Sequence, residues 1–126
     1  MLVLDTSALL YWTLADAKLS TNAAEAIRQD LEIMISSISI WEIGLKVKRA
    51  RMSLPLSFPA YVDRLKEVDK VQVLPVTETT WLKNLELDWD HKDPADRTIV
   101  ATAIMLGCPL VTSDARVRSF YGAAIW

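Results

Sequence analysis

The sequence predicts a single α/β domain with a mostly parallel central sheet of four or five strands and helices on both faces. The chain has 126 residues, which suits one compact domain with one core. Short apolar runs typical of buried strands alternate with longer segments of helical periodicity. No repeat, low-complexity segment or long linker interrupts this alternation, so we expect residues 1–126 to form one domain.

The first part of the chain contains two expected strands and three helices. MLVL at 1–4 is continuously apolar, as in a strand buried on both faces, and a helix follows at 5–14, capped by its first or second residue. A serine and a threonine open the next helix, at 20–30. EIMIS at 32–36 is a second strand, and the apolar residues of 37–51 recur at helical spacing.

The middle of the chain continues the alternation. A proline-containing connection at 53–59 leads to a helix at 60–68. VQVLPV at 71–76 is the third expected strand, and 77–87 the next helix. The helix at 94–106 begins with a proline and is followed by a glycine, the residues most often found at those two ends.

The end of the chain supplies the last two strands. PLVT at 109–112 is the fourth strand, 114–120 a short helical turn, and AAIW at 123–126 a weak final strand. Strands alternating with helices predict parallel pairing with right-handed crossovers.

The composition limits the possible functions. Apolar residues make up 52%, charged residues 24%, and the net charge is −2, which argues against a basic surface that coats nucleic acid. The single cysteine, Cys108, excludes an internal disulfide and a cysteine zinc cluster, and it fits a reducing cytoplasm. No signal peptide or membrane-spanning stretch is expected, so we predict a cytoplasmic protein without membrane contact.

Two aspartates in HKDPADRTIVATA, residues 91–103, have different expected roles. Asp93 precedes a proline and is well placed as an N-cap, while Asp96 would occupy the third helical position, where an acid can close a capping box. Ile99, Val100 and Ala103 share the helix face of Asp96, however. Asp96 should therefore point inward, where an ionised carboxylate is costly without a cation or hydrogen-bond donors.

Three further acids occupy comparable places. Asp5 and Asp114 follow strands and could simply be N-caps. Glu42 is expected in the first turn of its helix, where it could form a capping box with Ser39 or pair with Lys46. Each acid alone is explained at least as well by such a structural role as by a function.

Together the four acids predict a cation site. The carboxyl ends of parallel strands share one edge of a sheet, where ligands bind, and Asp5 and Asp114 must both lie there. Four converging carboxylates repel one another unless a cation neutralises them. Oxygen ligands, with His91 the only histidine, favour Mg²⁺ or Mn²⁺ over Zn²⁺, and metal-assisted phosphodiester hydrolysis is the reaction such a site suits.

Four segments in order give the chain a family resemblance. LVLDTSALL, SSISIWEIG, HKDPADRTIVATA and LVTSD resemble the four acidic motifs of the PIN-domain ribonucleases, and their order, spacing and total length most resemble the VapC-type toxins. The resemblance spans nearly the whole chain. It implies a PIN-like three-layer α/β/α sandwich and a Mg²⁺- or Mn²⁺-dependent endoribonuclease that acts as the toxin of a toxin–antitoxin pair.

The resemblance also assigns roles by position. The metal-binding and catalytic acids of the family match Asp5, Glu42, Asp96 and Asp114. Thr6 and Ser113 match small polar residues that support the site, and Arg97 matches a residue that contacts the acids from behind. The implied partners are an RNA substrate (tRNA, rRNA or mRNA), a cognate antitoxin that blocks the site, and a second copy of the chain in a homodimer.

Positively charged residues give two further expectations. Some members of the family carry additional acids shortly after the last motif, where this chain has Arg116 and Arg118, so one metal ion is a safer expectation than two. Directly after Glu42 come four basic residues, which either contact RNA phosphates or form an ordinary solvated helix face: Lys46, Lys48, Arg49 and Arg51.

Three assignments remain open at this point. His91 is expected to be a loop residue rather than a general base. One rival function is a catalytically silent PIN-like domain that only binds a partner. The other is a phosphoacceptor receiver-like domain, which fits poorly because Asp5 is followed by a threonine and a serine instead of a second acid.

Overall fold

A parallel five-stranded sheet forms the centre of the protein, in a computed structural model that describes all residues, 1–126. The strand order is β3-β2-β1-β4-β5, and every neighbouring pair is parallel. The elements in chain order are β1 (Leu2–Leu4), α1 (Thr6–Thr13), α2 (Thr21–Gln29), β2 (Ile33–Ser36), α3 (Ser37–Lys48), α4 (Phe58–Lys66), β3 (Val71–Leu74), α5 (Glu78–Glu86), α6 (Pro94–Leu106), β4 (Leu110–Val111), α7 (Ala115–Phe120) and β5 (Ala124–Ile125).

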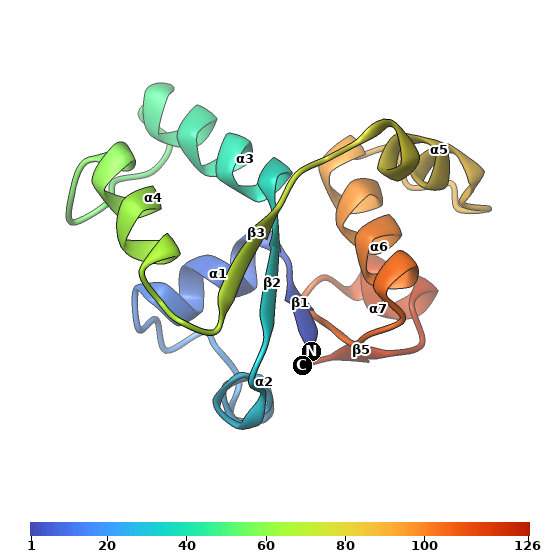
Figure 1. Ribbon diagram of the computed structural model, residues 1–126, viewed down its shortest axis with the longest axis horizontal. Helices are drawn as coiled ribbons and strands as arrows, with labels where there is room; N and C mark the ends of the chain where they lie inside the picture. Colours follow the sequence, from blue (N-terminus) through green and yellow to red (C-terminus); the bar gives the residue numbers. More distant parts are fainter.

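The helices cover both faces of the sheet, as a parallel sheet requires. Figure 1 shows α1, α3 and α4 on one side and α5, α6 and α7 on the other, with both termini close together near the middle of the molecule. Along β1, Leu2 and Leu4 belong to one hydrophobic cluster and Val3 to the other, and all three side chains are at most 2% exposed. The α/β class and the PIN-like three-layer arrangement expected from the sequence are confirmed.

Several helix boundaries agree with the local chemistry of the sequence. Asp93 caps α6 by accepting hydrogen bonds from the backbone N–H groups of Ala95 (2.9 Å) and Asp96 (3.0 Å), which confirms its expected role. Gly107 ends the same helix with φ = 63°, a left-handed conformation that glycine adopts at little cost. No helix has both the length and the apolar character needed to cross a membrane.

Two expectations about helix starts were wrong. Ser36, not Ser39, is the N-cap of α3, so Glu42 lies in the second turn of that helix and forms no capping box. The helix at 60–68 begins at Phe58 instead, because Ser57 accepts a hydrogen bond from the backbone N–H of Ala60 and the proline of the expected connection fits within the first turn.

Candidate active site

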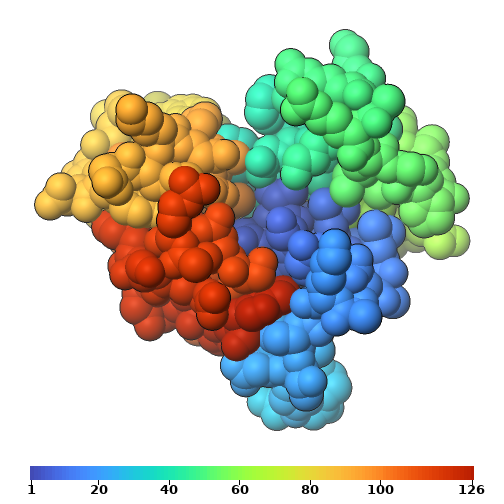
Figure 2. Space-filling model, turned by 180° about the vertical axis from the view of Figure 1, so that it is seen from behind, coloured from blue at the N-terminus to red at the C-terminus, as the bar shows by residue number.

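The four acids predicted from the sequence all lie at the carboxyl edge of the sheet. Asp5 directly follows β1 and caps α1, and Asp114 follows β4 and caps α7. Asp96 is in the first turn of α6, and Glu42 in the second turn of α3. Seen from behind in Figure 2, the green α3–α4 side and the yellow and orange α5–α6 side flank a notch above the blue N-terminal segment.

Asp5 is the most enclosed of these acids. Its carboxylate accepts a hydrogen bond from the backbone N–H of Ala8 at 2.7 Å, and the residue is only 8% exposed. Burial raises the pKa of Asp5 to about 6, despite hydrogen bonds from Thr112 and Ala8 that favour the ionised form. The charges of Asp96 and Asp114 raise it further, so the three carboxylates are near enough to repel one another.

Glu42 is held by the first motif. The Thr6 hydroxyl donates a hydrogen bond to the Glu42 carboxylate, and Thr6 Oγ1 and Ser39 Oγ share a second hydrogen bond of 2.9 Å. Burial raises the pKa of Glu42, and the aspartates at the start of α6 add to the rise, while the Thr6 hydrogen bond and the charge of Lys46 oppose it. Thr6, to which the family resemblance assigns a supporting role, therefore contacts Glu42 directly.

Asp96 has a partner that the sequence reasoning missed. His91 Nε2 lies 2.7 Å from Asp96 Oδ2, and His91 is only 8% exposed although it belongs to the segment between α5 and α6. Burial raises the pKa of Asp96, the hydrogen bond with His91 lowers it, and the charges of Asp93 and Asp114 raise it again. The signal available in the sequence was the only histidine of the chain, five residues before Asp96.

Arg97 holds the segment that carries His91. Its guanidinium donates to the side chain of Asn84 (3.2 Å) and to four backbone carbonyls, those of Asn84, Leu87, Trp89 and His91. No contact joins it to a carboxylate, so Arg97 does not touch the acids as the resemblance implied. It fixes the chain from Asn84 to His91, and His91 in turn contacts Asp96.

The supporting hydroxyl after β4 belongs to Thr112. Thr112 is fully buried, hydrogen-bonds Asp5, and accepts a 3.1 Å hydrogen bond from the backbone N–H of Asp114. Ser113, the residue predicted for this role, is half-buried and its hydroxyl has no hydrogen-bond partner within the protein. Extended backbone points successive side chains in opposite directions, which explains the shift by one residue.

Comparison of the sequence with family models identifies the family to which these acids and this fold belong. The model described as the PIN domain matches residues 2–123. This chain belongs to the PIN-domain family. Within that family it is similar to ribonuclease VapC22 of Mycobacterium tuberculosis, with 31% identity over 118 residues that cover 93% of this chain and 89% of the relative.

Solved structures of toxins and toxin–antitoxin complexes share the fold at much lower identity. A toxin–antitoxin complex from Klebsiella pneumoniae superposes with a TM-score of 0.74 at 16% identity, covering 100% of this chain and 97% of the other. Mycobacterium tuberculosis VapC20, a toxin that cleaves the sarcin–ricin loop, gives a TM-score of 0.67 at 17% identity, with 94% of both chains covered. VapBC2 of Rickettsia felis, bound to a DNA fragment of its promoter, gives 0.67 at 17%, covering 98% and 95%.

The candidate ligand atoms of this PIN domain are of the chemical type that hard divalent cations prefer. Its candidate ligands are carboxylate oxygens, and burial together with neighbouring carboxylates raises the pKa of Asp5, Glu42 and Asp96. No group of three or more His, Cys, Asp or Glu side chains is gathered closely enough to hold an ion, however. The acids therefore lie at one edge of the sheet and influence one another's pKa, but their side chains are not arranged to coordinate an ion.

The four basic residues after Glu42 divide between two surfaces. Three of them, Lys46, Arg49 and Arg51, line a small cavity of about 130 Å³ that Glu42 also lines. Lys48 instead lines an apolar groove of about 890 Å³ between α3 and α4. All four are exposed, and only Lys46, Arg49 and Arg51 share a cavity with one of the acids, Glu42.

Proposed function

We propose that this PIN domain is the toxin of a toxin–antitoxin pair and hydrolyses RNA phosphodiester bonds with a divalent cation, Mg²⁺ or Mn²⁺. As a VapC-type member of its family it is a toxin ribonuclease. The observation that carries the metal-dependent mechanism is the unmatched set of acids at the carboxyl edge of the sheet, where burial and mutual repulsion raise the pKa of three of them. An added positive charge is what such a set requires.

The proposed ligands are Asp5, Glu42, Asp96 and Asp114. When bound, the cation would stabilise charge on the phosphate and make a water molecule more acidic. The protein contributes the orientation of the acids: Thr112 and the Ala8 N–H hold Asp5, Thr6 holds Glu42, and His91 holds Asp96. Such contacts behind the ligands fix their direction and tune their basicity.

The partners follow from the same site and its surroundings. The substrate is RNA (tRNA, rRNA or mRNA), approached through the basic rim of Lys46, Arg49 and Arg51. The cognate antitoxin would cover the acids, because covering them keeps RNA out of the site. The exposed Trp41 in the apolar groove offers an aromatic anchor for the antitoxin. A homodimer of this chain is part of the same proposal.

The test is RNA cleavage by the purified protein. We expect fragments from a mixture of tRNA, rRNA and mRNA with Mn²⁺ or Mg²⁺, none with EDTA, and none from the Asp96→Asn variant with either ion. Asp63→Asn is the matched control, because Asp63 is an exposed aspartate on α4 outside the site. Cleavage by Asp96→Asn at the rate of the unmodified protein would show that the acids are wrongly assigned.

One observation favours the catalytically silent alternative. No three potential ligands are gathered for an ion, which is what a PIN-like domain that only binds a partner would also present. The same experiment separates the two, since a silent domain cleaves nothing under any metal condition. The receiver-like alternative is set aside, because the chain belongs to a different family.

A further inference from the structure

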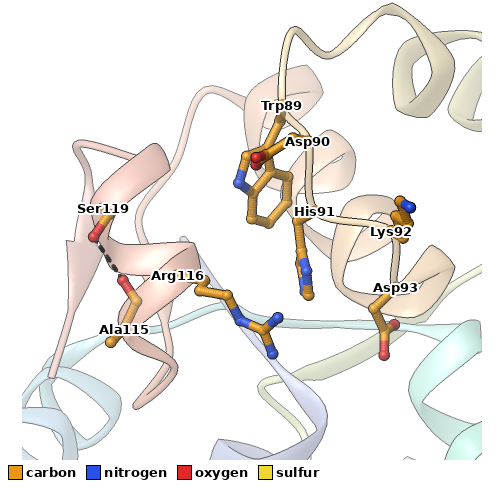
Figure 3. A pocket seen from close by; sticks show the side chains of 8 residues that line it. All are labelled: Trp89, Asp90, His91, Lys92, Asp93, Ala115, Arg116 and Ser119. Atoms are coloured by element: carbon orange, nitrogen blue, oxygen red, sulfur yellow. Dashed lines mark hydrogen bonds between the residues drawn. The ribbon is translucent and has the colours of Figure 1, made fainter.

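A second cavity adjoins the proposed active site. It has a volume of about 760 Å³ and lies between residues 89–93, ahead of α6, and one face of α7 (Figure 3). His91 lines it and also contacts Asp96, so only one side chain separates the cavity from a proposed catalytic acid. None of the roles assigned above uses this cavity.

Two exposed cations without an ion pair line the cavity, Lys92 and Arg116, and in Figure 3 the side chain of Lys92 points away from that of Arg116. Arg116 is the one that reaches into the cavity. Figure 3 shows its guanidinium reaching from α7 across the cavity toward His91 and Asp93. The side chain is exposed, and it forms no ion pair and no hydrogen bond within the protein. An arginine with all its donors unused, beside a set of acids, is available to an anionic ligand.

Apart from Asp90 and Lys92, which are exposed and form no ion pair, the polar and aromatic walls of the cavity are already engaged. Trp89 stacks on Phe120 with ring centroids 4.6 Å apart and an interplanar angle of 7°, and it also contacts His91 at 4.8 Å. One Oδ of Asp93 accepts two backbone N–H groups of α6. Because the aromatic rings pack on one another, their faces are not free to stack on a nucleotide base. The Arg116 guanidinium is therefore the group that we expect to recognise a ligand.

We propose that Arg116 binds a phosphate of the RNA strand next to the cleaved bond, with this cavity as the subsite that receives it. The inference rests on the proposed function and extends it to the substrate's neighbouring nucleotide. An RNA strand that crosses Asp96 and continues past His91 brings the phosphate of its next nucleotide to this cavity. A planar guanidinium can bind phosphate oxygens through two hydrogen bonds, and its charge offsets the repulsion between RNA and the acids.

The test measures RNA binding without catalysis. Fluorescence anisotropy with a labelled single-stranded RNA 10-mer of random sequence, in EDTA, gives affinity at several salt concentrations. We expect Arg116→Ala to bind about tenfold more weakly at low salt. Its plot of log affinity against log salt should be shallower by about 0.7, the loss of one single-strand phosphate contact. Arg116→Lys should recover part of the affinity, since the charge remains.

Arg118→Ala is the matched control, because Arg118 is exposed on the same helix but lies outside the cavity. We expect it to bind like the unmodified protein. Equal RNA affinities and salt slopes for the two alanine variants would overturn the subsite, even if the protein cleaves RNA and the proposed function stands. An oligoglutamate peptide serves as a probe for an acidic protein ligand, and an effect of Arg116→Ala on that peptide alone would also overturn it. If cleavage fails in every metal while the Arg116 effect on RNA persists, the subsite stands and the catalytic proposal fails.

Discussion

Carboxylates at the two ends of the sheet have pKa values shifted in opposite directions. At the amino end, the carboxylate of Asp30 forms an ion pair with the N-terminal ammonium group of Met1 at 2.7 Å. Partial desolvation of Asp30 is outweighed by this hydrogen bond and charge, which lower its pKa. Nearby, the ammonium group of Lys70 donates to the carbonyls of Ile27 (2.6 Å) and Asp30 (3.3 Å). Asp30, Lys70 and the N-terminal ammonium group therefore all have partners at this end.

At the carboxyl end, the acids have hydrogen bonds but no ion pair with a lysine or an arginine. Asp5, Glu42 and Asp96 are partly or fully buried, and their pKa values are raised. Only His91 and Lys46 act against the rise by their charge, on Asp96 and Glu42 respectively. The difference indicates that Asp30 serves the fold, whereas the acids at the other end are kept at a cost to stability, as functional sites often are.

The largest effect should come from removing one acid of the carboxyl end. Asp96→Asn should reduce metal-dependent RNA cleavage by more than about a hundredfold, because several kcal/mol of charge stabilisation depend on the cation that Asp96 helps hold. Cleavage rates are compared with those of Asp63→Asn, and circular dichroism checks that the variant is folded. Full activity of Asp96→Asn would contradict the conclusion that the acids at the carboxyl end serve catalysis.

The pH dependence of stability should differ in sign between the ends. Because the pKa of Asp5 rises from 3.8 to about 6 on folding, the folded protein binds more protons than the unfolded chain in that range, so this group lowers stability as pH increases from about 4 to 6. In EDTA, the stability gained by Asp5→Asn over the unmodified protein should grow across this range by up to about 3 kcal/mol. Urea unfolding at each pH measures it.

Asp30→Asn supplies the opposite case. The lowered pKa of Asp30 means that its contribution is present above its ordinary pKa and is lost as pH falls through the folded value. Asp30→Asn should therefore be less stable than the unmodified protein near pH 7, with a difference that shrinks in acid. Parallel pH profiles for the two variants would contradict the comparison.

A smaller effect is expected from the partner of Asp96. His91→Ala should weaken Mn²⁺ binding about 10- to 100-fold, the usual cost of losing a contact that orients a ligand. Isothermal titration with Mn²⁺ measures this directly, and His91→Gln, which can still offer an N–H, should lose less. Equal Mn²⁺ affinities for His91→Ala and the unmodified protein would show that the contact has no bearing on the site.

The smallest effect is expected at the cap of α6. Asp93→Ala removes the acceptor of two backbone N–H groups and should cost about 1 kcal/mol of stability, with much of the cleavage activity retained. Urea unfolding and the RNA cleavage assay on one preparation separate the two aspartates. A loss of activity as large as that of Asp96→Asn would mean that Asp93 is itself part of the chemistry.

The sequence predicted those features that depend on local pattern. Apolar runs located the strands, and the order of strands and helices placed Asp5 and Asp114 on one edge of the sheet. Asp93 and Asp96 were separated correctly as cap and inward-facing residue, because the proline and the helix periodicity define both directions.

Contacts that depend on loop conformation could not be predicted. His91 is placed beside Asp96 by a segment that Arg97 ties, through three carbonyls of its irregular backbone and one of α5, and no periodicity encodes those contacts. Thr112 took the place expected for Ser113 because one residue of extended chain reverses the side-chain direction. These side chains adjust the site, whereas the pattern of strands and helices decides where it lies.

The most direct test of the account is thermal unfolding with and without Mn²⁺ at pH 7. If the acids bind Mn²⁺ in the folded state alone, mass action predicts that Mn²⁺ at a hundred times its Kd raises the stability of the unmodified protein by about 2.7 kcal/mol. Asp5→Asn should be more stable than the unmodified protein in EDTA and gain much less from Mn²⁺. If Mn²⁺ stabilises both proteins equally or neither of them, the acids at the carboxyl end of the sheet do not form a cation site.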